Sequence, residues 1–247
     1  MNASADQIHL ALVAVAQLRQ QRAGNAALLS AHAAIKRFQA LRFQATYPDL
    51  LNSPRYKATA QFFLYELYSD KDYSERDQQF ARIADTIGKL FPQSVVNTAT
   101  ALAEVHALTE QLDHAMAVQN AASIANEPAL NDTARYITCW RRVSNPAARS
   151  QQLEMVLALG ESLNGLTRKP ALRTLLKMMR GPATAAGLGS LQKFLESGLE
   201  AFQNMGGADE FLKLIAERET QWINYLFEDD AVACENKLTA LLAVNSR

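Results

Sequence analysis

The sequence predicts an all-α protein, folded as a single bundle of about nine to ten helices. Apolar residues recur at helical spacing along most of the chain, and the alternation typical of half-buried strands is absent. Glycine and proline are sparse, with 10 and 7 residues, and they cluster at the expected helix boundaries. A chain of 247 residues with 49% hydrophobic composition is long enough to bury one large core. We therefore expect one helical domain over residues 1–247.

Composition disfavours several classes of function. Lys and Arg total 25, Asp and Glu also total 25, and the sequence pI is about 6.9, so no basic surface for nucleic acid or an anionic membrane is predicted. The two cysteines, Cys139 and Cys234, form neither a disulfide framework nor a zinc-finger spacing, and we expect reduced thiols. The apolar stretch 8–18 is too short to span a bilayer and lacks a basic leader. The sequence thus predicts a soluble, cytoplasmic protein.

The N-terminal region predicts two helices. Ser4 and Gln7 resemble a capping box that opens a helix over residues 5–22. A second helix follows and ends near residue 46, before a proline. His32 lies in an alanine-rich part of this helix, and we expect it at the surface or at the boundary of the core.

The most apolar helix is expected over residues 54–69. Ser53 followed by Pro54 is a strong helix start, because serine caps free amides and proline suits the first helical position. Apolar and aromatic side chains then cover nearly every side, which indicates a buried helix. Glu66 interrupts this run at the edge of the core and needs a partner there.

The next helix begins at Ser74, and its apolar stripe also carries Arg76, one turn before Phe80. We expect this guanidinium to point at the core and to form a bidentate pair with Glu66 or with Asp77. Two interpretations stay open: a structural ion pair that ties two helices together, or a contact between Arg76 and an anionic ligand.

A long helix is expected from Pro92 to about residue 118. His106, Glu110 and Asp113 lie beside its apolar stripe at positions i, i+4 and i+7. Together with Glu66 they could form a carboxylate and histidine site for a transition metal, like those inside four-helix bundles. The alternative is a polar helix flank with internal hydrogen bonds, and the paired Glu-x-x-His motifs of di-metal bundles are absent.

The loop 126–131 is the best candidate for a subdomain boundary, although its shortness argues against independent domains. We expect Trp140, in the helix that follows, to lie in the core. Further helices are expected over residues 146–164, 170–181, 188–205, 208–227 and 230–244.

Two positions in these C-terminal helices stand out. Gly198 lies in mid-helix, which predicts close approach of another backbone or of a ligand. Arg218 falls within the apolar stripe of its helix, so we expect a second guanidinium that points inward.

Several motifs recur in order along the chain, and together they resemble the bacterial family named for its FFLEELY motif. They are Phe62–Tyr68, Arg76–Ile83, Leu108–Met116, Gly187–Glu196 and Met205–Ala208. The resemblance covers residues 56–227, with Tyr65 where the family name has a glutamate. It implies an uncharacterised bacterial protein and supplies no catalytic residue.

Two classes of function remain. The first is a helical module that binds a small anionic ligand or a protein partner, with a buried network of Glu66, Arg76, Asp77 and Arg218. The second is a metal-dependent or acid–base enzyme that uses Glu66, His106, Glu110 and Asp113. A structural homo-oligomer is a third alternative. The sequence contains no nucleophile with its base and no cofactor fingerprint, so it favours the binding module, with no cofactor predicted.

Overall fold

The computed structural model describes residues 3–244, and within this range it contains twelve α-helices, one π-helix and no strand. The all-α prediction is confirmed. The number of helices exceeds the expected nine to ten. One additional short helix, α3 (Pro48–Asn52), begins where Pro48 occupies the first helical position.

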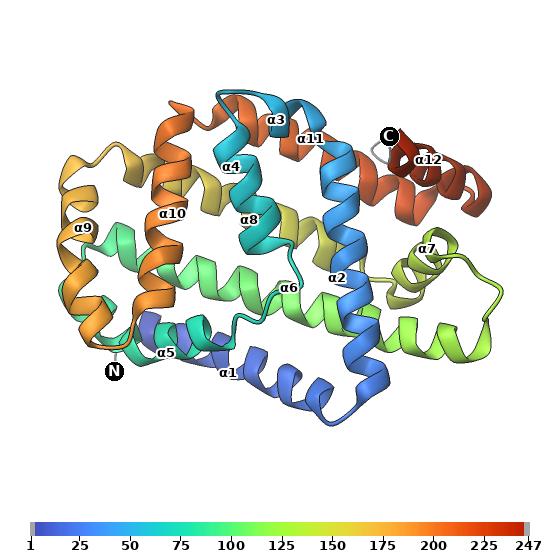
Figure 1. Cartoon of the computed structure of the whole chain (residues 1–247), viewed down its shortest axis with the longest axis horizontal. Helices are drawn as coiled ribbons and strands as arrows, with labels where there is room; N and C mark the ends of the chain where they lie inside the picture. The colour runs from blue at the N-terminus through green and yellow to red at the C-terminus, as the bar shows by residue number, and fades with distance from the viewer. Residues whose placement is uncertain (1–2, 245–247) are drawn as a thin grey trace.

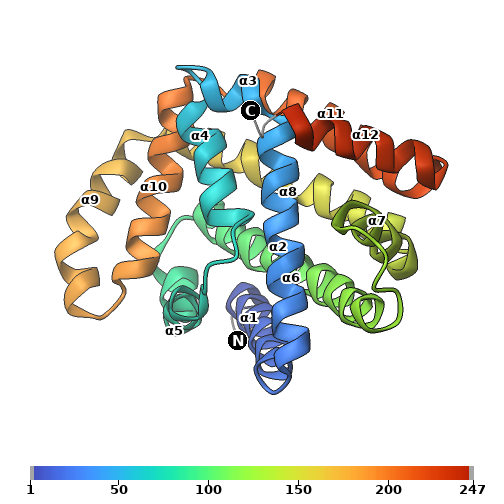
Figure 2. The same cartoon turned by 45° about the vertical axis from the view of Figure 1, so that its right-hand side comes forward.

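The fold is arranged around α6 (Gln93–Asn126), which runs through the middle of the molecule along its longest axis (Figure 1). It contacts α1 (Ala3–Ala23), α2 (Ala26–Thr46), α7 (Asp132–Val143) and α8 (Pro146–Thr167). Figure 2 shows α2 standing across α6 and α8. The predicted end near residue 118 was wrong, because no helix breaker follows until Pro128. The helical conformation is disfavoured for Glu127, the residue before this proline, and the helix ends there.

The remaining helices flank this centre on two sides. On one side lie α4 (Lys57–Phe62), α5 (Ser74–Leu90), α9 (Pro170–Ala185) and α10 (Gly189–Met205), and on the other α11 (Asp209–Glu228) and α12 (Ala231–Val244) accompany α7 (Figure 1). Helix α9 continues through Gly181 and Pro182, where we expected it to end. Helix α10 ends at Gly206, whose φ of 69° lies in the left-handed region that glycine adopts readily.

The buried side chains form two hydrophobic clusters. The larger one packs around Phe43, Phe63 and Phe211, and the smaller one contains Trp140 and Trp222. Helices α2, α6 and α11 contribute to both clusters, so the same three helices support the two parts of the core. Trp140 lies in the core as predicted, with 6% of its surface exposed.

The predicted helix over residues 54–69 is divided. Ser53 ends α3, and its hydroxyl accepts a hydrogen bond from the amide of Tyr56 at 3.4 Å, just before α4 begins. Residues Phe63–Leu67 then form a π-helix, η1, in which the amide of Tyr68 donates to the carbonyl of Phe63 at 3.0 Å. Single π-helical turns are rare and occur frequently at functional sites. The aromatic motif of the sequence is thus a widened turn.

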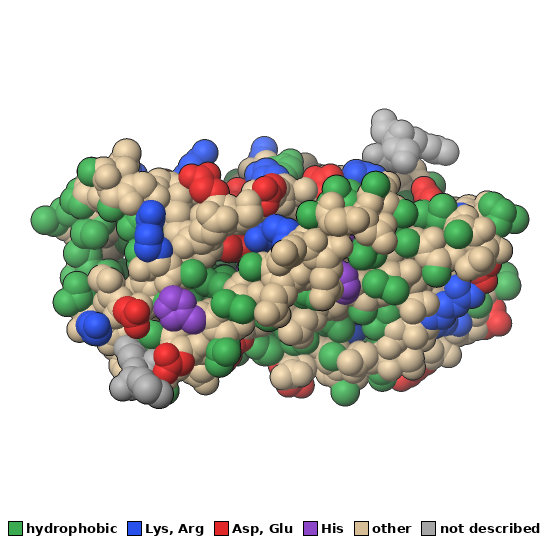
Figure 3. Space-filling model, turned by 90° about the horizontal axis from the view of Figure 1, so that it is seen from below, with side chains coloured by type: hydrophobic (Ala, Val, Ile, Leu, Met, Phe, Trp, Pro, Cys, Tyr) green, Lys and Arg blue, Asp and Glu red, His purple; other side chains and the backbone are tan. Residues whose placement is uncertain are grey.

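Among the described helices, none combines the length and the apolar character that crossing a bilayer requires. Acidic and basic side chains are interspersed on the face shown in Figure 3. Hydrophobic side chains gather at the left end of that view, where Figure 1 places α9. Met178 of α9 is 71% exposed, whereas Met179 and Leu175 are about half as exposed, at 37% and 38%.

Candidate functional site

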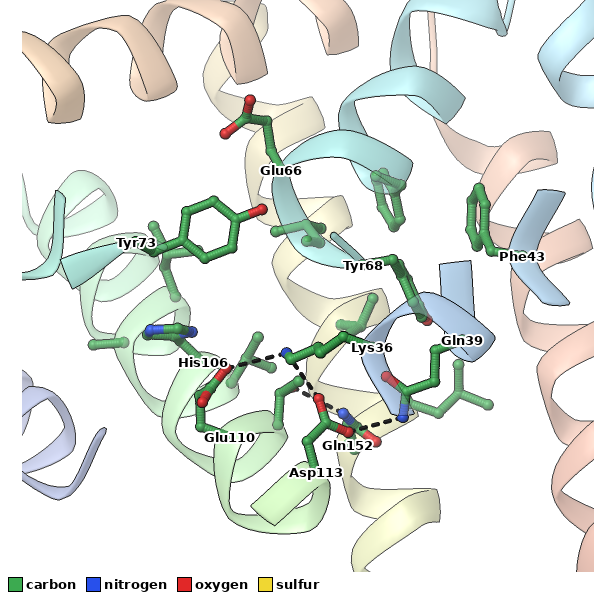
Figure 4. Close-up of a pocket in the computed structure, with 18 of the residues that line it drawn as sticks. Lys36, Gln39, Phe43, Glu66, Tyr68, Tyr73, His106, Glu110, Asp113 and Gln152 are labelled. Carbon is green, nitrogen blue, oxygen red and sulfur yellow. Dashed lines mark hydrogen bonds and ion pairs between the residues drawn. The ribbon is translucent and has the colours of Figure 1, made fainter. Parts of the chain in front are cut away.

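A cavity of about 120 Å³ lies where η1 and helices α2, α5, α6, α7, α8 and α11 meet, and we name it the polar cavity. Its wall contains more charged and amide side chains than a hydrophobic core tolerates without partners. Figure 4 shows several of them pointing toward one another. The charged and amide side chains that line it are Lys36, Gln39, Arg42, Glu66, Arg76, Asp77, His106, Glu110, Asp113, Arg149, Gln152 and Glu219.

Four of these side chains form a buried ion cluster between α2 and α6. Nζ of Lys36 lies 3.1 Å from Oε1 of Glu110 and 2.8 Å from Oδ2 of Asp113. The amide of Gln39 donates to Oδ1 of Asp113 at 2.8 Å, and Nη2 of Arg22 donates to Oε2 of Glu110 at 2.7 Å. Each helix presents two side chains one turn apart, so the pair on α2 faces the pair on α6 (Figure 4).

The charges of this cluster hold one another ionised. Burial by itself would raise the pKa of Glu110, but the charges of Lys36 and Arg22 outweigh it and lower that pKa. The pKa of Asp113 is lowered in the same way, because Lys36 outweighs the effect of burial. Burial would lower the pKa of Lys36, and the two carboxylates raise it instead. All three groups are therefore charged at neutral pH.

His32 lies at the border of this cluster and is partly buried, which is a boundary position of the kind expected from the sequence. Its side chain is 13% exposed, and Nε2 lies 3.7 Å from Oε2 of Glu110. Burial and the neighbouring charge of Arg22 lower its pKa to about 4. The imidazole is consequently neutral at pH 7.

A second buried ion pair joins α2 to α11. Arg42 donates to the two oxygens of Glu219 at 3.1 and 2.7 Å, and the hydroxyl of Tyr47 donates to Oε1 of the same carboxylate at 2.8 Å. The inward-pointing charge of α11 is thus Glu219. We expected Arg218, but its side chain is 28% exposed and forms a bidentate pair with Asp49, with both distances 2.7 Å. Because consecutive helical residues point about 100° apart, only one of the two neighbours can face the cavity.

At the other end of the cavity, Asp77 is in contact with three side chains, which are two guanidinium groups and one imidazole. Nη2 of Arg19 lies 2.8 Å from its Oδ2, and Nε2 of His106 lies 2.9 Å from the same oxygen. Arg76 contacts Oδ1 through Nε at 3.6 Å, so the predicted Arg76–Asp77 contact is present but is not bidentate. Burial would raise the pKa of Asp77, whereas His106 and the two guanidinium groups lower it.

Glu66 does not join these clusters. Its carboxylate pairs with Lys71 at 3.4 Å and is 31% exposed, so the expected pair with Arg76 is replaced by a partner in the following loop. Figure 4 shows the Glu66 carboxylate pointing away from Lys36, Glu110 and Asp113. The π-helix changes the direction of side chains at the end of this helix, which helical periodicity could not predict.

The predicted metal ligands do not form one ligand set. In the part of the chain that the structure describes, no group of three or more His, Cys, Asp and Glu side chains could hold a metal ion. The carboxylates of Glu110 and Asp113 are instead in contact with Arg22 and Lys36, which occupy the positions that a cation would take.

Arg149 is a charged side chain in the wall that lacks an ion-pair partner among the residues that the structure describes. It is 6% exposed, and its guanidinium lies 4.1 Å from the centroid of the Trp140 ring. Nη1 donates to Oε1 of Gln152 at 3.0 Å, and Nη2 has no hydrogen-bond partner among the described residues. No described carboxylate lies within ion-pair distance of Arg149, and burial lowers its pKa. The cavity thus contains a buried positive charge without its own counter-ion.

Most other buried polar atoms of the same wall that lack a hydrogen-bond partner are also donors; the acceptor among them, Oδ2 of Asp113, lies 2.8 Å from Nζ of Lys36. Nη1 of Arg76, the hydroxyl of Tyr136 and Nε1 of Trp140 are buried without a hydrogen-bond partner among the described residues. Burial raises the pKa of Tyr136, so its hydroxyl keeps its proton. Arg76 lies between two aromatic rings, 4.1 Å from the centroid of Tyr73 and 4.4 Å from that of Phe194.

The charge balance of the described wall and its ion partners is positive. The buried or nearly buried cations are Arg22, Lys36, Arg42, Arg76 and Arg149, and the buried carboxylates are Asp77, Glu110, Asp113 and Glu219. These buried groups carry an excess of one positive charge; of the more exposed groups, Glu66 in the wall is paired with Lys71, and Arg19 is a further cation beside Asp77. An acceptor-rich, negatively charged ligand is the chemical complement of this cavity.

Five residues of the wall were predicted from the sequence, whereas the residues opposite them were not; the five are Arg76, Asp77, His106, Glu110 and Asp113. On α2 the spacing Lys36-x-x-Gln39-x-x-Arg42 placed three polar groups on one side of a helix, and this was the signal available. There was no such signal in the sequence for Arg149 and Glu219. Each is one charged residue on a helix that also has exposed charged residues, so its spacing does not distinguish it.

Comparisons with known proteins identify a family. The model described as Domain of unknown function (DUF8198) matches residues 17–233, which include every residue that lines the polar cavity except Leu12. No curated protein and no solved structure matches the chain.

Proposed function

This chain belongs to the DUF8198 family, and we propose that it is a binding protein whose polar cavity holds a small anionic ligand. One observation carries the proposal: Arg76 and Arg149 line the same cavity, and each has a buried guanidinium nitrogen without a hydrogen-bond partner among the described residues. A buried charge that lacks its partner destabilises the folded state by several kcal/mol, on the order of 3–5 when a pair is broken. An anion bound there removes this penalty, and the resulting free energy favours binding.

The kind of group that binds follows from the donors. A guanidinium donates through a planar fork that suits carboxylate and phosphate oxygens. The hydroxyl of Tyr136 and the indole N–H of Trp140 add two neutral donors beside Arg149. The ion cluster of Lys36, Glu110 and Asp113 satisfies its own charges, so it fixes the position of α2 against α6 and leaves the guanidinium groups for the ligand.

Titration calorimetry with acetate, benzoate and inorganic phosphate tests the proposal. We expect at least one of these anions to bind, and we expect Arg149→Met and Arg76→Met each to weaken that binding at least tenfold, because each removes a charged donor. Arg168→Met is the matched control for Arg149, since Arg168 is an exposed arginine at the end of α8. Absence of binding by all three anions, or equal affinity in the parent and Arg149→Met, would overturn the proposal.

A second candidate function is acid–base catalysis at His106, carried by its contact of 2.9 Å with Asp77 at the cavity wall. A carboxylate that binds one ring nitrogen fixes the tautomer and the orientation of a histidine. Hydrolysis of a panel of nitrophenyl esters tests this function. Activity that is lost in His106→Gln and retained in His114→Gln, on the same helix, would support it, and activity that is absent or equal in both would exclude it for these substrates.

We also propose that the FFLEELY motif resemblance and the matched family describe the same group of proteins. The matched residues 17–233 contain all five motifs that carry the resemblance, and the central motif forms the π-helix at the polar cavity. An alignment of family members tests this proposal: an aromatic run with one carboxylate at positions 62–68 in most members would support it.

A further inference from the structure

A second cavity, of about 250 Å³, lies between α5, α6, α8, α9 and α10, and we name it the apolar cavity. Hydrophobic side chains form nearly all of its lining, with the side chains of Thr86, Thr98 and Gln192 as its polar members. An engineered apolar cavity of about 150 Å³ stays dry and binds benzene. The apolar cavity is larger than that, so it has room for an aliphatic group longer than a benzene ring.

The two cavities adjoin each other. Phe63, Leu67, Phe80 and Phe194 are among the residues that line both of them. Two of these residues belong to the π-helix, where the widened turn places their side chains between the two spaces. Because these residues line both cavities, a single layer of residues lies between the two spaces at this wall.

Arg76 marks the boundary on the polar side. Its guanidinium lies 4.4 Å from the ring centroid of Phe194, which lines both cavities, and its buried Nη1 has no hydrogen-bond partner among the described residues. Its ion partner Asp77 is shared with Arg19 and His106, which lie closer to that carboxylate. A charged donor thus lies beside a side chain that also lines the apolar cavity.

From this juxtaposition we propose that the ligand is a single-chain amphiphile: its anionic head binds in the polar cavity at Arg76, and its aliphatic tail fills the apolar cavity. The inference rests on the proposed function, because it assigns the tail of the same ligand. A head with carboxylate or phosphate oxygens satisfies Nη1 of Arg76. A linear alkyl tail suits the apolar cavity, because the lining of that cavity has almost no hydrogen-bonding group.

Helix α9 forms the outer wall of the apolar cavity and is the least buried helix around it. Only Ala183 of this helix is fully buried, whereas Leu176 and Met179 line the cavity and are partly exposed. Methionine side chains are flexible and adapt to irregular apolar spaces. The tail therefore has an adaptable wall on the side nearest solvent.

Titration calorimetry with acetate, octanoate and dodecanoate, each below its micelle concentration, tests the inference on the full chain. We expect affinity to rise by about fourfold for each added methylene until the cavity is full, which is the gain that burial of one methylene gives. Dodecanol, which has the tail without the charge, is expected to bind at least tenfold more weakly than dodecanoate. Titration with dodecyl phosphate allows a phosphate head to be compared with the carboxylate head of dodecanoate. Whichever of the two binds more tightly identifies the preferred anionic head.

Two pairs of variants locate the tail and the head. Leu176→Trp fills the apolar cavity, and Met178→Trp places the same side chain at an exposed position of the same helix. We expect Leu176→Trp to lose the dependence of affinity on tail length and Met178→Trp to keep it. Ala99→Phe is a second filling variant, on α6, in case the first does not fold. Arg76→Met is expected to remove the preference for dodecanoate over dodecanol, and Lys89→Met, at an exposed position of the same helix, is expected to preserve it.

The outcomes separate this inference from the proposed function. If acetate or phosphate binds through Arg149 and dodecanoate binds no more tightly than acetate, the amphiphile is wrong and the anion site stands. If dodecanol binds as tightly as dodecanoate, the apolar cavity holds a tail but Arg76 does not recognise the head, which also overturns the inference. If no anion binds, with or without a tail, both proposals fail.

Discussion

Nζ of Lys36 on α2 lies 2.8 Å from Oδ2 of Asp113 on α6, in an ion pair whose two side chains are only 6% and 1% exposed. Lys36 also contacts Glu110, so one cation of α2, which was not singled out from the sequence, pairs with two carboxylates of the central helix. Breaking a buried pair leaves a charge without compensation, which is far more destabilising than the pair itself is stabilising.

Lys36→Met is therefore expected to lower the free energy of unfolding by about 3–5 kcal/mol, measured by urea denaturation at pH 7. Lys57→Met, at an exposed position of α4, is expected to change it by less than about 0.5 kcal/mol. The double variant Lys36→Met with Asp113→Leu is expected to recover part of the loss, because one of the stranded carboxylates is gone. A single variant as stable as the parent would show that the cluster does not stabilise the fold.

Replacement of two buried arginines by methionine is expected to have different effects on the free energy of unfolding. Arg42→Met leaves Glu219 buried without its bidentate partner and should lower the free energy of unfolding by about 3–5 kcal/mol. Arg149→Met strands no carboxylate and should leave stability within about 1 kcal/mol of the parent, or raise it. Equal losses in the two variants, measured by urea denaturation without added anion, would show that Arg149 has a counter-ion.

His32 should make the protein sensitive to mild acid. Its pKa is about 4 in the folded chain and about 6.5 when unfolded, so the unfolded state gains a proton first as the pH falls below 6.5. The loss of stability from this group is about 2 kcal/mol at pH 5. The carboxylates with lowered pKa values, Glu110 and Asp113, stay ionised in the folded state at this pH and are mostly ionised in the unfolded state, so they contribute mainly at lower pH.

His32→Gln is accordingly expected to narrow the difference in unfolding free energy between pH 7 and pH 5. His9→Gln serves as the control, because that side chain is 42% exposed. Urea denaturation at the two pH values measures both variants. An unchanged difference in His32→Gln would mean that the pKa of the imidazole is the same in the folded and the unfolded state.

Both thiols should be inert while the chain is folded. Cys139 and Cys234 are 0% exposed, and burial raises the pKa of Cys139 to about 11. Since the thiolate is the reactive form, we expect a thiol reagent at pH 8 to label neither cysteine faster than the protein unfolds. Fast labelling of either residue in native buffer would place it at the surface. The prediction of reduced thiols is consistent with two free cysteines in the structure.

Glycines at two helical positions should differ in their tolerance of alanine. A Cβ at Gly198 would lie 2.9 Å from Cζ of Phe62, so the close approach expected there is made by an aromatic side chain. Overpacking costs about 1–3 kcal/mol, and the gain in helix propensity of about 1 kcal/mol does not offset it fully. Gly165 has open space around its Cβ position, and Gly165→Ala should stabilise by about 0.5–1 kcal/mol. Thermal unfolding compares the two variants, and stabilisation by both would show that Phe62 moves aside freely.

Much of the fold follows from local patterns. The caps at Asn131 and Asn145, with side chains that accept from the amides of Ala134 and Ala148, start α7 and α8 where the sequence predicted. The pairs between residues far apart in the sequence could not be predicted from these local patterns. Arg76 was found because it interrupts an apolar stripe, whereas Arg149 sits on a helix whose periodicity gives no sign that its guanidinium lies over Trp140. The π-helix was likewise invisible, because its first residues have the same apolar pattern as an α-helix.

The sequence by itself determined that this chain is all-α, where most of its helices begin, and that Asp77, Glu110 and Asp113 are polar groups on helices with a buried side. Helix propensity, capping and amphipathic spacing act between neighbours in the chain, so one sequence contains them in full. Only the tertiary structure decided which charges meet. The crossing of α2 over α6 brings Lys36 to Asp113, and the adjoining of two cavities brings Arg76 to the edge of an apolar space. Lys36 and Asp113, for example, lie 77 positions apart in the sequence (113 − 36), and such contacts depend on helix packing, which no local pattern encodes.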